Sequence, residues 1–233
     1  MTRPRFLLLH GLLLSLMLLR PSQADEADVR QAQTLVQTWL TNASQVENLV
    51  IDFVQERKLK TLRRPLSRQG KIWLRRDGAL RWQIDEPPAR LLLRQPKADE
   101  VLSIDTRKRT WTALDWSDAE GNADAQGLRM LMDSQKPDLA TFETVFQIRS
   151  AQPLPEAPGR WRIGLDLKDR RAAVAVSGVS FDIEPETGIL SQMEFRLRDG
   201  SLYRTRVLRV EKSARIADEV FTFDLNGFTQ TPP

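Results

Sequence analysis

Few side chains in this sequence have the types and the spacing that catalysis requires. The best candidates for acid–base chemistry are Asp182 and Glu184, which the alternation of side chains along a strand places on the same polar face. Two neighbouring carboxylates can serve as general acid and general base, but such pairs are more often ordinary solvated charges. We therefore expect that the protein is not an enzyme.

Nucleophiles and metal ligands are scarce as well. The chain has no cysteine, and its single histidine, His10, lies in an N-terminal segment that we expect to be removed. This excludes Ser-His-Asp and Cys-His catalysis, zinc sites built from His or Cys, and disulfide bonds from the mature chain. No Gly-x-x-x-x-Gly-Lys phosphate loop is present either. We expect no catalytic residue, no metal and no cofactor.

Residues 1–24 have the composition of an export signal. Arg3 and Arg5 precede an apolar run over residues 6–19 that is short for a membrane span, and Ser22-Gln23-Ala24 offers small residues to a signal peptidase. We expect cleavage there and one exported domain over residues 25–233. Losing three arginines lowers the net charge from +4 to about +1, so composition gives no argument for binding nucleic acid.

A run of six cations lies between residues 56 and 68. Such a run is usually a solvated loop or a strand edge. The functional alternative is a docking surface for an acidic partner or for anionic lipid head groups, in which we assign the leading roles to Arg63, Arg64 and Arg68. The six cations are Arg57, Lys58, Lys60, Arg63, Arg64 and Arg68.

Strand patterns dominate the rest of the chain, and the clearest lies at residues 70–87. An Asp77-Gly78 pair between alternating apolar residues predicts a β-hairpin. We expect one face of its second strand to be apolar and the other to be wet. The apolar face carries Leu80, Trp82 and Ile84, and the wet face carries Arg81, Gln83 and Asp85.

Helical spacing appears in three places. It predicts a helix over residues 29–43, a short helix carrying Leu128, Leu131 and Met132, and another short helix that Pro137-Asp138 opens. In the last of these, Leu139, Phe142 and Phe146 are expected to share a side. Further alternation predicts strands at residues 49–55, 91–94, 101–105, 109–114, 161–167, 179–183, 193–197 and 221–225.

Together, about ten amphipathic strands and three short helices predict a mainly β domain of the α+β class. An antiparallel sheet whose outer face is solvated has to pack only on its other face. The pattern therefore favours a strongly curved antiparallel sheet, an open half-barrel whose concave face is covered by the helices. This arrangement encloses an apolar space, either a filled core or a ligand pocket. The residues expected to line it are Leu80, Trp82, Ile84, Leu128, Leu131 and Met132.

A set of short motifs spans most of the mature chain. Each is degenerate, but their order resembles that of the periplasmic outer-membrane lipoprotein carrier protein family (LolA-like). The chain departs from the family at Arg76-Asp77, where the family has Arg-Pro, and at Asp105-Thr106, where it has Asp-Gly. The motifs are a leading helix, Phe53-x-Gln55, Gly70-x-x-Trp73-x-x-Arg76, Leu80-x-Trp82-x-x-x-x-Pro87, a central helical insert, Phe181-x-Ile183 with Gly188, Asp199-Gly200 and Phe221-x-Phe223.

The resemblance implies an open β-barrel closed by helices, whose interior receives the acyl chains of a lipoprotein or related lipid. It implies an inner-membrane donor transporter complex and an outer-membrane acceptor, and we expect a monomer. It also implies that Arg76 bonds to the lid and helps to set the closed state, whereas spacing alone is equally consistent with an arginine in solvent. The basic segment is similar to that of paralogues in specialised lipid or polyene pathways.

Two functions compete for this fold. A periplasmic carrier would shield acyl chains in an apolar cavity and pass them toward the outer membrane. It needs an apolar pocket, a movable lid and weak polar latches, because each buried methylene contributes about 0.8 kcal/mol. The alternative is a periplasmic sensor or assembly module that binds a lipoprotein or polypeptide partner with the same half-barrel. Lipid that copurifies with the protein would favour carriage.

Overall fold

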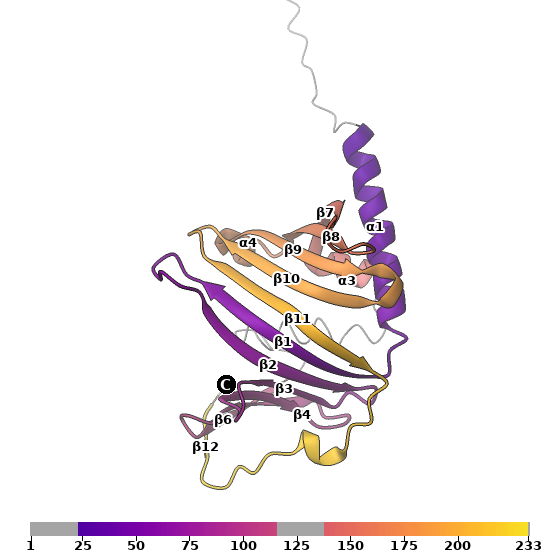
Figure 1. Ribbon diagram of the computed structural model, residues 1–233. Helices are drawn as coiled ribbons and strands as arrows, with labels where there is room; N and C mark the ends of the chain where they lie inside the picture. The colour runs from indigo at the N-terminus through magenta and orange to yellow at the C-terminus, as the bar shows by residue number, and fades with distance from the viewer. Residues whose placement is uncertain (1–22, 116–137, 233) are drawn as a thin grey trace, which may run out of the picture.

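A computed structural model describes residues 23–115 and 138–232, and it contains a single open sheet of twelve strands (Figure 1). The strand order is β12-β6-β5-β4-β3-β2-β1-β11-β10-β9-β8-β7. Neighbouring strands are antiparallel except β12 and β6, which are parallel. The sheet does not close on itself, since β7 and β12 lie at its two edges. The predicted fold class, a mainly β domain with an open antiparallel sheet, is confirmed.

The strands predicted between residues 49 and 197 are all present, whereas no strand was predicted at residues 146–153 or 229–230. The strands are β1 (Asn48–Lys58), β2 (Leu66–Arg75), β3 (Leu80–Ile84), β4 (Arg90–Arg94), β5 (Glu100–Asp105), β6 (Thr110–Asp115), β7 (Phe146–Pro153), β8 (Trp161–Leu167), β9 (Val176–Glu184), β10 (Ile189–Leu197), β11 (Leu202–Lys212) and β12 (Thr229–Gln230). The described helices are α1 (Gln23–Ala43), α3 (Leu139–Val145) and α4 (Arg170–Ala175), with short 3-10 helices η2 (Pro185–Thr187) and η3 (Asp218–Phe221).

The predicted hairpin at residues 70–87 is formed by β2 and β3. Its register pairs Gly70 with Ile84 and Leu74 with Leu80. At the turn, Gly78 adopts a left-handed φ of 86°, which glycine tolerates because it has no Cβ. The Asp77 carboxylate accepts a hydrogen bond from the backbone N–H of Ala79 at 3.1 Å, which satisfies a donor in the turn. The Asp-Gly signal thus predicted both the hairpin and its position.

The face of β3 that was predicted to be solvent-exposed is instead covered by a segment near the C-terminus. Gln83 is only 3% exposed, and Arg81 donates a hydrogen bond to the carbonyl oxygen of Val220 at 3.1 Å. The covering segment includes η3, whose Phe221 is buried and lies under the Arg75 guanidinium at 4.9 Å. The prediction of a strand over residues 221–225 is therefore wrong. Phe221 anchors a segment that packs across the sheet, and the chain joins the sheet only further on, at β12.

Helix α1 confirms the prediction for residues 29–43 and begins earlier, at Gln23. It packs on the β7 to β10 end of the sheet through an apolar stripe that includes Trp39, whose ring meets that of Phe181 edge-on at 6.5 Å between centroids. The other stripe residues in this cluster are Ala32, Val36 and Leu40.

Helix α3 occupies part of the second predicted short helix. The Asp138 carboxylate caps it by accepting a hydrogen bond from the backbone N–H of Thr141 at 2.6 Å. Phe146, predicted to be helical, is the first residue of β7, although its ring remains 5.1 Å from that of Phe142. Helix α4 was not predicted.

The basic segment is divided between two strands and the loop that joins them. Strand β1 continues to Lys58 and β2 begins at Leu66, so only residues 59–65 form the loop between them. Each sheet edge also has a distinctive feature. At one edge β7 shows a register shift against β8 between Ile148 and Ser150, and at the other β12 pairs with β6 over only two residues.

Candidate ligand-binding face

The side of the sheet on which α1 packs, here called the inner face, carries two apolar clusters. One lies beneath α1 on strands β7 to β10. The other lies at the opposite end and includes all three sheet residues predicted to line a cavity. Leu80, Trp82 and Ile84 are each less than 7% exposed. They pack with Phe53, Ile72, Leu92 and Val101.

A depression of about 200 Å³ adjoins this second cluster. Its lining combines apolar residues, among them Trp82 and Leu92, with polar ones that include the cations Arg90 and Lys108. The volume is below the roughly 300 to 1,000 Å³ typical of ligand pockets. A long acyl chain would therefore have to displace side chains packed against this face. The remaining lining residues are Leu91, Ser103, Ile104, Asp105, Thr110 and Thr112.

Sequence reasoning missed the polar half of this lining. Ser103 pairs with Leu92 on one side and with Thr112 on the other, so the three lie in one row across β4, β5 and β6. At the strand ends Arg90 faces Asp105. Each strand was predicted, but the row depends on the register between strands, which alternation within one strand does not give.

The other predicted site residues lie apart from this depression. Arg76 is exposed, and its guanidinium pairs with the Glu47 carboxylate. Arg63 and Arg64 are exposed in the 59–65 loop, whereas Arg68 lies in β2 at 3.5 Å from the Asp85 carboxylate. Leu128, Leu131 and Met132 fall outside the described residues. The roles assigned to all of these residues remain predictions.

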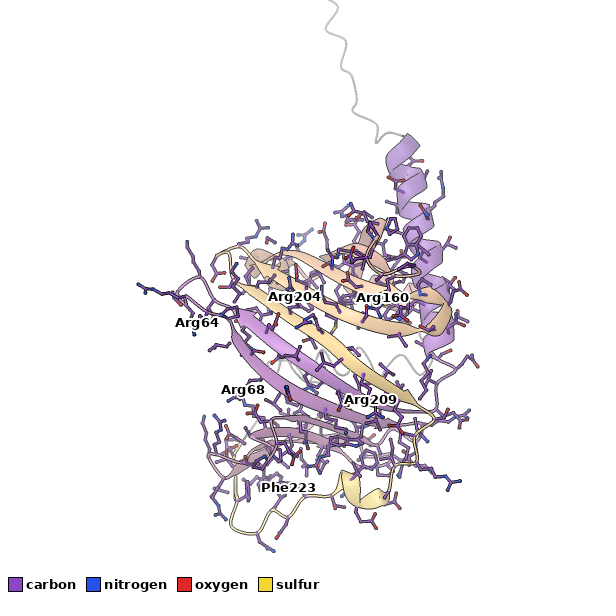
Figure 2. All side chains as sticks on the ribbon, viewed as in Figure 1. Arg64, Arg68, Arg160, Arg204, Arg209 and Phe223 are labelled. Atoms are coloured by element: carbon purple, nitrogen blue, oxygen red, sulfur yellow. The ribbon has the colours of Figure 1, made fainter. Side chains whose placement is uncertain are left out.

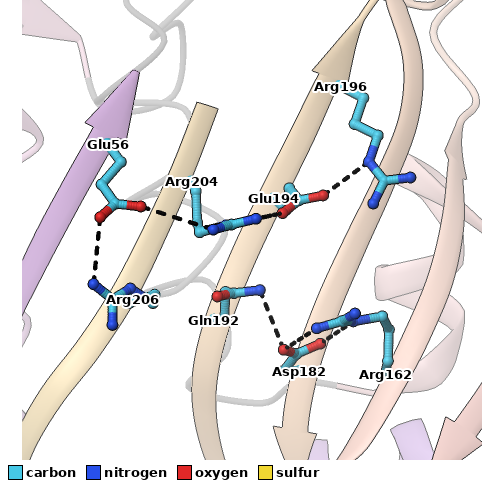
Figure 3. Close-up of polar contacts among 8 residues, drawn as sticks. All are labelled: Glu56, Arg162, Asp182, Gln192, Glu194, Arg196, Arg204 and Arg206. Atoms are coloured by element: carbon cyan, nitrogen blue, oxygen red, sulfur yellow. Dashed lines mark hydrogen bonds and ion pairs between the residues drawn. The ribbon is translucent and has the colours of Figure 1, made fainter. Parts of the chain in front are cut away.

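The carboxylates Asp182 and Glu184 share a face of β9, and each has a different arginine as its partner. Asp182 is 6% exposed and accepts two hydrogen bonds from Arg162, at 2.7 and 2.8 Å, and one from Gln192 at 3.2 Å (Figure 3). Glu184 accepts a separate hydrogen bond from Arg160 at 2.6 Å. Each carboxylate is thus held by its own arginine, on the outer face of the sheet.

The outer face continues this pattern on β10 and β11. Glu194 is 4% exposed and accepts hydrogen bonds from Arg204 at 2.7 and 2.9 Å and from Arg196 at 2.8 Å (Figure 3). Burial alone would raise the pKa of Glu194, but the two guanidinium groups outweigh it and hold this pKa below its usual value. Glu56 links Arg204 to Arg206, at 3.8 and 3.3 Å. The network gives the outer face fixed, mutually compensated charges.

Membrane-spanning helices and clusters of metal-ligating side chains are two further kinds of feature that could define a site. Within residues 23–115 and 138–232, no helix combines the length and apolar character needed to cross a bilayer. In the same ranges no three His, Cys, Asp or Glu side chains gather closely enough to hold a metal ion.

The family assignment follows from the sequence over most of its length. Residues 44–224 match the family described as "Outer membrane lipoprotein carrier protein LolA". This range includes all of the sheet except β12. It also includes the inner-face cluster around Trp82 and the depression beside that cluster. The chain therefore belongs to the LolA family. Comparison with curated protein sequences gives no significant match.

Several solved structures are similar to this chain at low sequence identity. An uncharacterized conserved protein from Thermus thermophilus is similar with a TM-score of 0.55 and 8% identity, covering 87% of this chain and 99% of that one. A putative outer membrane lipoprotein-sorting protein domain from Vibrio parahaemolyticus gives 0.46 and 7%, with coverages of 83% and 97%. The Pseudomonas aeruginosa MucA/MucB complex gives 0.42 and 18%, with coverages of 83% and 61%. Of these three, only the first likeness is strong enough to support the shared fold.

Proposed function

We propose that this protein is a periplasmic carrier that shields the acyl chains of lipoproteins or related lipids and passes them toward the outer membrane. Membership of the LolA family supports the class of function, and the observation that carries it to this chain is the inner-face cluster around Trp82 with the depression beside it. Apolar side chains buried on the inner face can exchange contacts with one another for contacts with an acyl chain, at little net cost.

The proposal includes movement of the cargo. The donor would be an inner-membrane transporter complex and the acceptor an outer-membrane receptor, as the resemblance to the family implies. We retain Arg76 as a candidate latch. Its exposed ion pair with Glu47 contributes little to stability, so it can be exchanged for another contact at small cost.

Filling the depression tests cargo binding. Ser103 lies in the row of lining residues, and Ser103→Trp should occupy the space beside Trp82 and weaken binding of a fluorescent fatty acid by about tenfold or more, because one or two kcal/mol of apolar contact is lost. Ser67→Trp is the matched control, since Ser67 is exposed on β2. Binding is measured by fluorescence titration, with displacement by an acylated peptide and circular dichroism to check folding.

The outcomes separate the competing functions. A wild-type protein that binds neither the probe nor the acylated peptide would refute the carrier proposal. Binding of an unacylated polypeptide partner with an affinity that lipid does not change would favour a sensor or assembly module. Equal loss of binding in the Ser67→Trp control would show that the depression is not the binding site.

A further inference from the structure

Charge is divided between the two ends of the strands. Because neighbouring strands are antiparallel, one rim of the sheet gathers the loops at residues 59–65, 85–89, 106–109, 168–175 and 198–201. These loops, here called the basic rim, hold ten Lys or Arg residues against four Asp or Glu, and residues 138–145, which lead into β7 at the same rim, add Asp138 and Glu143. The opposite rim holds four against seven, counted over residues 44–47, 76–79, 95–99, 154–160, 185–188 and 213–221. The described molecule is therefore electrically polar along its strands.

The 59–65 loop is the most cationic part of the basic rim, and it projects beyond the sheet beside the β10–β11 turn (Figure 1). Lys60, Arg63 and Arg64 are exposed, and within the described ranges their side chains make no ion pair. Figure 2 shows Arg64 extending from this loop away from the sheet. A side chain without an acidic neighbour leaves its full charge available to an external anion.

Exposed apolar side chains accompany these cations. Five large apolar residues of the described ranges are exposed, and four of them lie at or beside the basic rim. Leu62 and Leu66, at 42% and 51% exposure, belong to the loop and to the first position of β2, and Val174 in α4 is 73% exposed. Val145 follows the same pattern, because its carbonyl oxygen accepts the N–H of Lys168 at the start of the 168–175 loop.

We propose that the basic rim docks on the surface of an anionic lipid bilayer, with the 59–65 loop entering the head-group region. Lys60, Arg63 and Arg64 would neutralise lipid phosphates, while Leu62 and Leu66 reach the boundary with the acyl chains. Binding to an acidic protein would explain the exposed cations, but it would not explain why leucine and valine side chains are exposed beside them. The acidic opposite rim is repelled by the same surface and so fixes the orientation of the molecule.

The docking also places the depression favourably. Arg90, Asp105 and Lys108 lie where β4 begins and β5 and β6 meet, which is the basic rim. A molecule docked in this way would hold the depression close to the lipid surface. The inference goes beyond the carrier proposal and does not depend on it, because a sensor could dock in the same way.

Vesicle sedimentation tests the proposal directly. The mature protein should bind vesicles of phosphatidylcholine mixed with phosphatidylglycerol, bind pure phosphatidylcholine weakly, and dissociate at high salt. Arg63→Gln with Arg64→Gln should reduce the affinity for anionic vesicles about tenfold or more. The matched control is Arg209→Gln with Arg215→Gln. This variant removes the same charge from the part of the molecule toward the opposite rim, and it should leave binding close to wild type.

Insertion of the loop is a separate readout. Because the chain contains no cysteine, Leu62→Cys creates a unique thiol for an environment-sensitive fluorophore. Anionic vesicles should increase its emission, whereas a label at Glu156→Cys, in the opposite rim, should not respond. Leu62→Ser with Leu66→Ser should weaken vesicle binding without changing its salt dependence, since the charges remain.

Three results would overturn the proposal. The first is wild-type protein that fails to bind anionic vesicles at low salt but binds polyglutamate, which would indicate an acidic protein partner. The second is an equal loss of vesicle binding in the Arg63/Arg64 and Arg209/Arg215 variants. It would show that binding depends on the net charge of the protein and not on the position of the charges. The third is a Leu62→Cys label that does not respond to vesicles that the protein demonstrably binds.

Discussion

Glu194 is the clearest case of a single residue whose environment alters its chemistry. Two arginines from its own and the neighbouring strand surround a carboxylate that the sheet has nearly removed from water. Alternation along the strand predicted at residues 193–197 places Glu194 on its polar face. Its burial was not predicted, because Arg204 reaches it from β11, whose inward side the sequence pattern does not assign.

This environment makes stability depend on pH. The pKa of Glu194 in the folded protein lies below its ordinary value of 4.5, so the unfolded chain binds a proton more readily. Its contribution is therefore complete above about pH 4.5 and is lost as the pH falls through the folded-state pKa. We expect Glu194→Gln to be less stable than wild type at pH 7, with a difference that shrinks as the solution is acidified. Urea unfolding monitored by circular dichroism at a series of pH values measures this.

A matched variant isolates the effect of burial. Asp166 accepts a hydrogen bond from Arg149 at 2.7 Å, but both side chains are about half exposed, so Asp166→Asn should change stability by less than about 1 kcal/mol. A stability difference between wild type and Glu194→Gln that stays constant on acidification would contradict the assignment of a lowered pKa to Glu194.

At the scale of elements, the contact between β1 and β2 depends on a glycine. Phe53 faces Gly70 across the two strands, and its ring lies over the position that a Cβ would occupy. A Cβ at Gly70 would be 2.2 Å from Phe53 Cζ and 2.7 Å from the carbonyl oxygen of Gln83. The absence of a side chain at Gly70 therefore allows Phe53 to pack into the inner-face cluster.

Gly70→Ala should destabilise the protein by about 1 to 3 kcal/mol, because the added methyl group overpacks a buried contact. Gly178→Ala is the control, since a Cβ at this strand position meets no atom within 4 Å and its change should stay within about 0.5 kcal/mol. Thermal unfolding of both variants beside wild type measures the difference. Equal melting temperatures for the two variants would mean that Phe53 moves aside without cost.

The elements also show where sequence reasoning succeeds and where it fails. The hairpin was predicted because Asp77-Gly78 and the flanking alternation agree, and both signals are local. The strand prediction for residues 221–225 was wrong because Phe221, Phe223 and Leu225 alternate as in a strand, although Phe221 ends the 3-10 helix η3 and residues 222–225 join no strand. The polar row containing Ser103 and Thr112 was not predicted, because its residues come together only through the register of three strands.

At the scale of the whole molecule, the two apolar clusters share no residue in the described ranges. Strands β1 and β11 connect them, and none of the apolar side chains of β11 is fully buried. The two ends of the sheet can therefore differ in local stability, as contiguous units do in many proteins.

Hydrogen exchange detects such a difference. Trp39→Ala should destabilise the α1 end by about 3 to 5 kcal/mol and accelerate exchange in β7 to β10 more than in β2 to β5. Leu80→Ala, in the other cluster, should produce the reverse pattern. Uniform acceleration in both variants would show that the sheet opens as one cooperative unit.

An open sheet has a further consequence for contact with other polypeptides. Each unpaired edge strand is a template to which a foreign strand can add, with backbone groups as the only requirement. Here the β6 edge is occupied by β12, whose Thr229 and Gln230 pair with Thr110 and Trp111, and β7 is interrupted by its register shift and ends at Pro153. Proline has no N–H to offer an added strand. Both ends of the sheet thus resist lengthening, so that an open sheet does not make the protein a seed for aggregation.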